Sequence, residues 1–291
     1  MDATRRLPAE LVEHARAFAA GGRAAVTPRD ASTVVLLRSD PGGPGGPDGA
    51  SGPGGVSGRG VQAYLLRRHA GMPFAGGMVA FPGGGVDLRD SDGVVAWAGP
   101  SAGDFAARLG CAELLARALV CAAVRETYEE AGVLLAGPTA ASVVGDTSAA
   151  DWEADRRALV DRSLAFSDFL DRRGLVLRAD LLAPWARWIT PDFEPRRYDA
   201  RFFVAALPAG QRTRDVSGEA DLVTWMRPVD ATAAVDTGRL RMLPPTYVVL
   251  SEIAGFQSPA QALVAAADRV IRPVQPTARI VGDQGWLSVE L

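Results

Sequence analysis

Three glutamates lie close together near the end of a predicted helix: Glu126, Glu129 and Glu130. The residues from Cys111 to Ala131 contain no Pro or Gly and are rich in Ala, Leu and Glu, so they predict a helix that ends at Gly132. Offsets of three and four residues place the carboxylates on one side of that helix. A helix C-terminus disfavours each nearby anion by about 0.3–1 kcal/mol, so the cluster requires compensating positive charge.

A divalent cation would provide that charge. Hard oxygen ligands on one rigid face are what Mg²⁺ or Mn²⁺ requires, and only Arg125 offers a local opposite charge. The alternative is an acidic face in solvent, which would bind no metal. It would also leave the glycine-rich segment Pro82–Gly85 far from the helix.

Composition excludes several other kinds of site. The 291 residues are 48% hydrophobic, enough for one large domain or two small ones. The net charge of −3 gives no electrostatic reason to expect a nucleic-acid partner. His14 and His69 are too few for a His/Cys zinc site, and Cys111 and Cys121 are predicted to be reduced core residues. No apolar run is long enough for a bilayer and the N-terminus predicts an amphipathic helix, so we expect a cytoplasmic protein without a membrane partner.

The elements that must position the glutamates alternate without strict βαβ repetition, which predicts an α+β fold with a mixed sheet. Strands are expected at 31–38 and 61–68 and near 182–191, 197–208 and 221–228. Residues 151–173 are predicted to be helical, and the tail to add a strand or hairpin. Residues 1–25 are predicted as an N-terminal helix, 26–257 as the main domain, and 258–291 as a C-terminal helix and tail. Within the main domain, 40–60 is predicted as a disordered loop because it is almost entirely Gly, Pro, Ser and Asp.

Two stretches resemble the halves of a known motif. "AFPGGGVDLRD" (Ala80–Asp90) and "RETYEEAGV" (Arg125–Val133) are similar to the box of the Nudix hydrolases, which is a glycine, five residues, an acid, seven residues, and then Arg-Glu-aliphatic-x-Glu-Glu-x-Gly-aliphatic. Gly84 fits the first glycine, Asp90 replaces the usual Glu, and Thr127 replaces an aliphatic residue. Asp90 and Arg125 are 35 positions apart where the box needs 8, so 27 residues (35 minus 8) interrupt it, within 91–117.

An interrupted box resembles one subgroup, the coenzyme A diphosphatase-like Nudix enzymes. Further similar stretches extend the resemblance to roughly 31–256; they are Trp185–Phe203, Gly218–Ala231 and Leu243–Glu252. It implies the Nudix α/β/α sandwich and Mg²⁺- or Mn²⁺-dependent hydrolysis of a pyrophosphate. The implied substrate is coenzyme A or acyl-CoA, cut to 3′,5′-ADP and (acyl-)4′-phosphopantetheine. Hydrolysis of ADP-ribose, a nucleotide sugar or a dinucleotide is the alternative, and the interrupted box with Asp90 also keeps open a Nudix-fold nucleotide-binding module without turnover.

The resemblance also assigns roles in the box. Glu126, Glu129 and Glu130 would ligate the metal, a carbonyl at Gly83 would be a further ligand, and Arg125 would orient a glutamate by an ion pair.

Outside the box the roles are more open. The general base would be Glu126 or, from a distant loop, Glu219, with Asp221 a weaker candidate. Arg68 and Arg197 are predicted to bind substrate phosphate, because the guanidinium fork matches phosphate oxygens. Three tryptophans are predicted to be core residues in preference to adenine-stacking ones: Trp185, Trp188 and Trp225. The sequence leaves open whether the insertion caps the site or forms an interface, and whether the helix at 258–270 serves a homodimer.

Overall fold

The computed structural model describes most of the chain, namely residues 3–6, 9–21, 24–42, 60–72, 75–91, 95–216, 218 and 220–289. Most of the predicted loop at 40–60 lies outside the described residues, and so does Glu219. Among the helices described, none combines the length and the apolar composition needed to cross a membrane.

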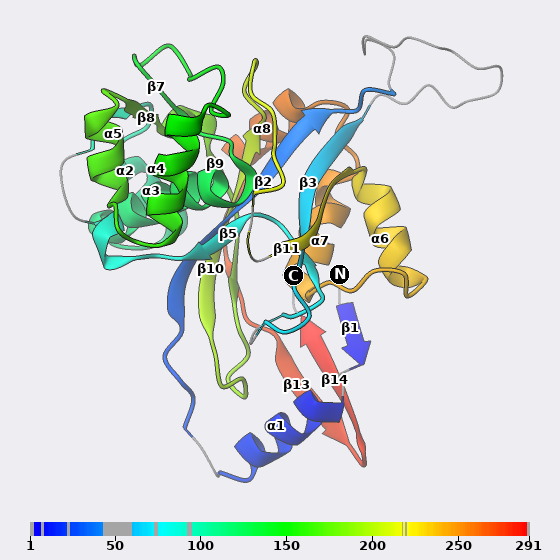
Figure 1. Cartoon of the computed structure of the whole chain (residues 1–291). Coiled ribbons are helices and arrows are strands. Elements are labelled where there is room, and N and C mark those ends of the chain that lie inside the picture. The colour runs from blue at the N-terminus through cyan, green and yellow to red at the C-terminus, as the bar shows by residue number, and fades with distance from the viewer. Residues whose placement is uncertain are drawn as a thin grey trace, which may run out of the picture.

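An eight-stranded mixed sheet forms the centre of the fold (Figure 1). Its strands are β2 (Arg29–Ser39), β3 (Val61–Arg68), β4 (Val79–Ala80), β5 (Gly83–Gly85), β9 (Ala183–Ile189), β10 (Tyr198–Ala206), β11 (Ala220–Met226) and β12 (Pro273–Val274). The order is β11-β3-β2-β10-β9-β12, with β4 paired to β3 and β5 paired to β2. β10 runs parallel to β2, whereas β3 runs antiparallel to β2 and β9 antiparallel to β10, which confirms the predicted mixed sheet.

Both faces of this sheet are buried. Val34, Val35, Leu36 and Leu37 in β2 are each 0% exposed. Val34 and Leu36 belong to one apolar cluster, and Val35 and Leu37 to another, because successive side chains of a strand point to opposite faces. A continuous apolar run of this kind is typical of a strand that has helices on both sides.

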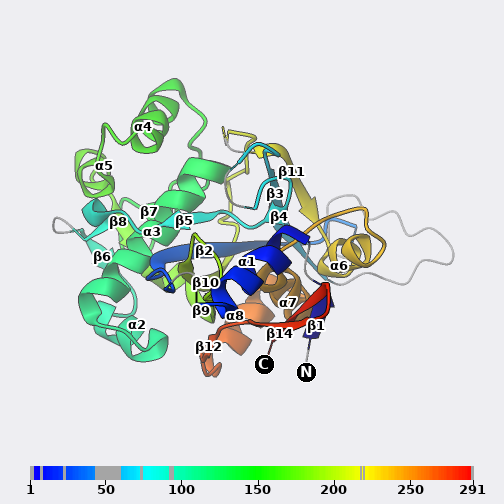
Figure 2. The ribbon, with the colours of Figure 1, turned by 90° about the horizontal axis from the view of Figure 1, so that it is seen from below.

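The two helical layers lie on opposite sides of β2 and β10 (Figure 2). One layer is built around α3 (Glu113–Ala131), which packs on β2 and ends at Gly132 in the left-handed conformation (φ 68°), as predicted. The other layer contains α7 (Pro244–Ile253) and α8 (Pro259–Ala267), with α6 (Pro228–Asp236) beside α7. The chain therefore has the α/β/α sandwich that the resemblance implied.

Helix α8 is part of this sandwich. Its Ala262 and Ala266 are buried, and the helix contacts β9 and β10. The apolar face of this helix was the reason to consider a homodimer. That face is covered by the sheet of the same chain, so it no longer supports a homodimer.

The insertion is built into the hydrophobic core. Its described part forms β6 (Trp97–Ala98) and α2 (Ala102–Leu109), and β6 pairs with β8 (Val176–Arg178), which in turn pairs with β7 (Ala136–Gly137). Phe105 in α2 is 2% exposed and makes ring contacts with Trp97 and with Phe203 of β10. The insertion therefore packs into the apolar cluster between α3 and the sheet.

The predicted helix at 151–173 is two helices, α4 (Ala150–Val160) and α5 (Phe166–Arg172). The break follows Asp161, where Arg162 takes a left-handed backbone with φ 63°. Residues 161–165 contain no Pro or Gly, so nothing in their composition marked the break.

The two ends of the chain meet in a separate small sheet. β1 (Ala3–Arg6) pairs with β14 (Gln284–Val289), which forms the expected tail hairpin with β13 (Thr277–Val281). Helix α1 (Ala9–Ala19) packs on that hairpin through Val12 and Ala15. The N-terminal segment predicted as helix thus also contains a strand.

Candidate active site

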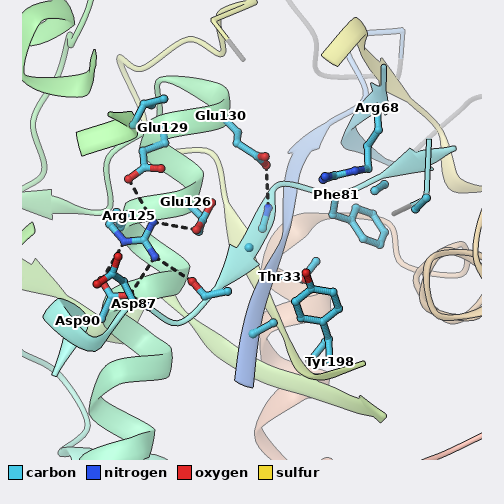
Figure 3. A pocket seen from close by; sticks show the side chains of 18 of the residues that line it. Thr33, Arg68, Phe81, Asp87, Asp90, Arg125, Glu126, Glu129, Glu130 and Tyr198 are labelled. Carbon is cyan, nitrogen blue, oxygen red and sulfur yellow. Dashed lines mark hydrogen bonds and ion pairs between the residues drawn. The ribbon is translucent and has the colours of Figure 1, made fainter. Parts of the chain in front are cut away.

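A cavity of about 500 Å³ lies beside the C-terminal half of α3. It is bordered by β5 and by the turn that joins α4 to α5, and it continues over β2 and β10 (Figure 3). Six of the predicted site residues line it: Arg68, Gly83, Arg125, Glu126, Glu129 and Glu130.

Arg125 lies among the carboxylates (Figure 3). Its Nε and Nη2 donate to the two oxygens of Asp90 at 2.8 and 2.9 Å. Its Nη1 donates to Glu126 at 2.8 Å and to Glu129 at 3.1 Å, and Nη2 also donates to the Gly85 carbonyl oxygen at 3.1 Å. The Asp90 side chain is 2% exposed and that of Arg125 is 12% exposed, so this two-pronged pair is buried. Charge-assisted pairs of this geometry are strong and directional.

The pair between Arg125 and Asp90 rejoins the two halves of the interrupted box. Asp90 ends a short 3-10 helix, Leu88–Asp90, whose first turn is capped by Asp87. The Asp87 amide donates to Asp90 Oδ2 at 2.8 Å, and the Arg89 amide donates to Asp87 Oδ1 at 3.0 Å. This local turn presents the Asp90 carboxylate to α3, although the intervening residues pass through β6 and α2.

The glycines of β5 are approached closely from two directions, Gly84 by the helix and Gly83 by the backbone of β2. A Cβ atom on Gly84 would lie 2.4 Å from a carboxylate oxygen of Glu126, and one on Gly83 would lie 2.5 Å from the Ser32 carbonyl oxygen. The Gly83 amide donates to Glu130 at 2.8 Å. The predicted glycine-rich loop therefore lies directly against the acidic helix, which excludes the alternative of a solvated acidic face.

Burial changes the acidity of the clustered carboxylates. It raises the pKa of Glu126 to about 7, with Arg125 opposing the shift and the charge of Glu129 adding to it. Burial also raises the pKa of Glu129, again against the effect of Arg125. Both shifts have the same physical cause: removing a carboxylate from water disfavours its ionised form unless a cation is close.

These residues fit a divalent cation. Glu126 and Glu129 already share one cationic group, the Arg125 guanidinium, so their carboxylates face a common point. Among the described residues, no three carboxylate, imidazole or thiol groups converge on one point as they stand. Glu130 instead accepts the Gly83 amide. A bound ion would therefore draw Glu126 and Glu129 partly away from Arg125.

A second arginine network closes the C-terminal end of α3. Arg156 of α4 donates to the Glu129 carbonyl oxygen at 2.7 Å and pairs with Glu153 through two bonds at 2.6 and 3.0 Å. Arg214 donates to Glu153 at 3.0 Å, and its own amide donates to the Ala131 carbonyl oxygen at 2.9 Å. These donors satisfy carbonyl groups that a helix end leaves open and place positive charge where the helix dipole is negative.

The sheet side of the cavity is aromatic. Phe81, Thr33 and Tyr198 lie on the far side of β5 from the glutamates, and Arg68 lies next to Phe81 (Figure 3). Trp188 of β9 also lines this side and is 3% exposed. The cavity thus has a carboxylate-rich side and an aromatic side, separated by a strand of three glycines.

Arg197 has a structural position in place of the predicted phosphate contact. Its guanidinium donates to the carbonyl oxygens of Thr190 and Val26 at 3.0 and 2.7 Å and pairs with Asp192 at 2.6 Å. Its neighbour Arg196 is exposed and lines the cavity. The loop before β10 turns the first arginine toward the cavity and the second into the protein.

The other candidates lie as follows. Glu219 is outside the described residues, although Gly218 lines the cavity. Asp221 pairs with Arg67 at 2.6 Å and is not among the lining residues. Trp185 is 1% exposed, in agreement with a core role, whereas Trp225 is half-buried under the Arg38 guanidinium.

Known proteins are similar to this chain in sequence and in fold. Residues 112–253 match the family described as the NUDT19 Nudix domain. A crystal structure of a Nudix hydrolase from Alicyclobacillus acidocaldarius superposes with a TM-score of 0.63 at 26% identity, covering 85% of this chain and 99% of that one. The chain is thus similar to Nudix hydrolases both in sequence and in fold. The matched residues include Arg125 and the three glutamates, and Asp90 precedes them.

Two curated relatives are acyl-coenzyme A diphosphatases named NUDT19. The protein from Gallus gallus is 26% identical over 59% of this chain and 47% of its own length. The one from Xenopus laevis is 26% identical over 47% of this chain and 39% of its own length. The matched region thus spans less than half of either relative.

Several residues that line the cavity were not predicted from the sequence. Asp87 and Arg89 stand inside the quoted box segment, so their spacing from Asp90 was a usable signal. Arg156 and Arg162 lie in the helical segment that follows the box, where nothing local distinguishes them from surface arginines.

Proposed function

We propose that this Nudix protein is a divalent-metal-dependent pyrophosphohydrolase whose substrate is coenzyme A or an acyl-CoA. The products would be 3′,5′-ADP and (acyl-)4′-phosphopantetheine. The observation that carries the proposal is the pair between Arg125 and Asp90, because it rebuilds an interrupted box at the edge of a cavity. A protein that had lost turnover would have no need to keep that buried pair together with three acidic side chains.

The residues would divide the work as follows. Glu126, Glu129 and Glu130 would hold Mg²⁺ or Mn²⁺, which neutralises phosphate charge and lowers the pKa of the attacking water. Arg125 would keep Glu126 and Glu129 oriented, since it donates to both. Glu126, which lines the cavity, would also be the general base that accepts a proton from the attacking water.

The sheet side would hold other parts of the substrate. Arg68 and Arg196 line this region, where a guanidinium can bind phosphate oxygens. Tyr198 and Phe81 offer ring faces and edges to a nucleobase or a pantetheine chain. A cavity of about 500 Å³ is of the size that ligand pockets usually have. The choice of coenzyme A is supported by the NUDT19 relatives, which share 26% identity with this chain.

The test is product release with Mg²⁺ or Mn²⁺ from CoA, acetyl-CoA, ADP-ribose, NADH and a nucleoside triphosphate, for wild type and Glu129→Gln. We expect the CoA compounds to be cleaved best, and the variant to lose about 10³-fold or more in kcat, since it removes a charged ligand. Glu113→Gln is the matched control, because Glu113 is exposed at the other end of α3.

Three results would contradict the proposal in different ways. Preference for ADP-ribose or NADH would keep the mechanism and reject the substrate. Equal loss in Glu129→Gln and Glu113→Gln would reject the site. Metal binding without turnover of any compound would favour the nucleotide-binding alternative.

A further inference from the structure

Backbone strain among the described residues is concentrated at the cavity. Only two non-glycine residues described have a positive φ, Ala75 at 54° and Arg162 at 63°, and both line the cavity. A side chain in this conformation is unfavourable, and such positions are common at functional sites. Arg162 carries a charge there, so it is the one that can recognise a ligand.

The position of Arg162 would normally suit glycine. It follows the last residues of α4, with its amide donating to the Leu159 carbonyl oxygen at 3.0 Å and the Leu164 amide donating to the Ala158 carbonyl oxygen at 3.0 Å. Helices commonly end in this way, and the left-handed residue is usually glycine because it has no Cβ. The fold therefore has no structural need for an arginine side chain at this point.

The Arg162 guanidinium is available to a ligand. Its side chain is 77% exposed, and its ion pair with Asp87 is long, 3.9 Å. By contrast, Arg125, Arg156 and Arg89 have close partners: Arg89 donates to both oxygens of Asp87 and to the Arg162 carbonyl oxygen. That last bond, at 2.7 Å, ties the strained turn to the box segment.

Arg162 is separated from the glutamates by two ion pairs. The first pair joins Arg125, which also contacts Glu126 and Glu129, to Asp90. The second pair joins Asp87 to Arg89, and Arg162 contacts Asp87. Figure 3 labels these residues except Arg89 and Arg162. The oxygens of a diphosphate at the glutamates would bind the metal that these carboxylates hold. Arg162 lines the same cavity, so a ligand whose diphosphate lies at the glutamates would present a different anionic group to Arg162.

We propose that Arg162 binds a phosphate monoester of the substrate that lies outside the diphosphate to be hydrolysed. This rests on the proposed function and assigns a residue to one part of that substrate, the phosphate on the sugar of the nucleoside diphosphate. Arg162 is then a specificity-determining residue, and its strained backbone is retained because glycine would remove the guanidinium.

The experiment compares two ligands that differ by one phosphate. Calorimetry with Mg²⁺ measures the Kd of 3′,5′-ADP and of 5′-AMP, and kinetics measures CoA against dephospho-CoA. The variants are Arg162→Gly, which relieves the strain, and Arg162→Lys, which keeps a charge. Arg172→Gln is the control, because Arg172 is an exposed, ion-paired arginine of α5 that does not line the cavity.

We expect Arg162→Gly to weaken 3′,5′-ADP binding by about tenfold to a hundredfold, the range for a charged hydrogen bond. Binding of 5′-AMP should stay within about twofold, KM for CoA should rise with little change in kcat, and the melting temperature should rise by roughly 1–3 °C. Arg162→Lys should be intermediate, and Arg172→Gln should match wild type.

Equal weakening of both ligands, or of neither, would overturn the proposal. Wild type that binds both ligands equally would overturn it as well. Failure of the proposed function is a separate result, because wild type would then release no product from CoA while the two calorimetric affinities still decide the role of Arg162.

Discussion

Two arginine–carboxylate networks hold helix α3, and they differ in what the arginine binds. In the box network, Arg125 donates mainly to the side chains of Asp90, Glu126 and Glu129. In the end network, Arg156 and Arg214 are joined through Glu153, and the bonds to the helix go to its backbone carbonyl oxygens.

This difference separates two tasks that the same residue types perform. An arginine that pairs with proposed metal ligands both orients them and competes with the metal for them. An arginine that binds backbone carbonyls offsets the charge of the helix end without occupying a ligand. The box network should therefore control metal affinity, and the end network should control stability.

Arg125→Lys tests the first half of this comparison and should have the largest effect. A lysine cannot donate to both Asp90 oxygens and to two glutamates at once. We expect kcat/KM and the apparent affinity for Mg²⁺ to fall by about 10–100-fold, as when groups that orient metal ligands are lost. The measurement is activity as a function of Mg²⁺ concentration, with Arg172→Lys as the control. An unchanged Mg²⁺ dependence would mean that Arg125 does not organise the ligands.

Arg156→Met tests the second half. The change leaves the buried Glu129 carbonyl and Glu153 with fewer partners, so the free energy of unfolding should fall by about 2–4 kcal/mol. Urea denaturation measures this. At a temperature where the variant is folded, its Mg²⁺ dependence should remain within about threefold of wild type. If the Mg²⁺ dependence of Arg156→Met shifts as much as that of Arg125→Lys, the two networks do not have separate roles.

The smallest effect is expected for Glu153→Gln, and it depends on pH. Hydrogen bonds from Arg156, followed by those from Arg214, lower the pKa of Glu153 from 4.5 to about 2. Ionised Glu153 therefore stabilises the fold above pH 4.5, and this contribution is lost as the pH falls toward 2. The variant should be less stable than wild type by about 1–2 kcal/mol at pH 7, with a smaller difference at pH 3. Urea denaturation at both values checks this, and a constant difference would contradict it.

Local patterns predicted the elements with strong periodicity or strong end signals. Strand Val61–Arg68 was predicted with its exact ends, and the acidic helix ends at Gly132 as expected. The break between α4 and α5 was missed, because Arg162 adopts a left-handed conformation that its residue type does not favour. Arg197 was predicted to bind phosphate, but Arg196 lines the cavity instead, because the direction of each side chain in a loop depends on the packing around it.

The sequence alone determined the composition of the Nudix box and the glycines that must lie beside it. It also predicted the central strand at 31–38, because residue type and spacing act through local geometry. Only the tertiary structure decided that Asp90 reaches Arg125 and that the insertion enters the core. The tertiary structure also brings Arg156 to a carbonyl oxygen at the end of α3 and packs α8 on the sheet. These contacts join segments far apart in the chain, and no local spacing encodes the path that brings them together.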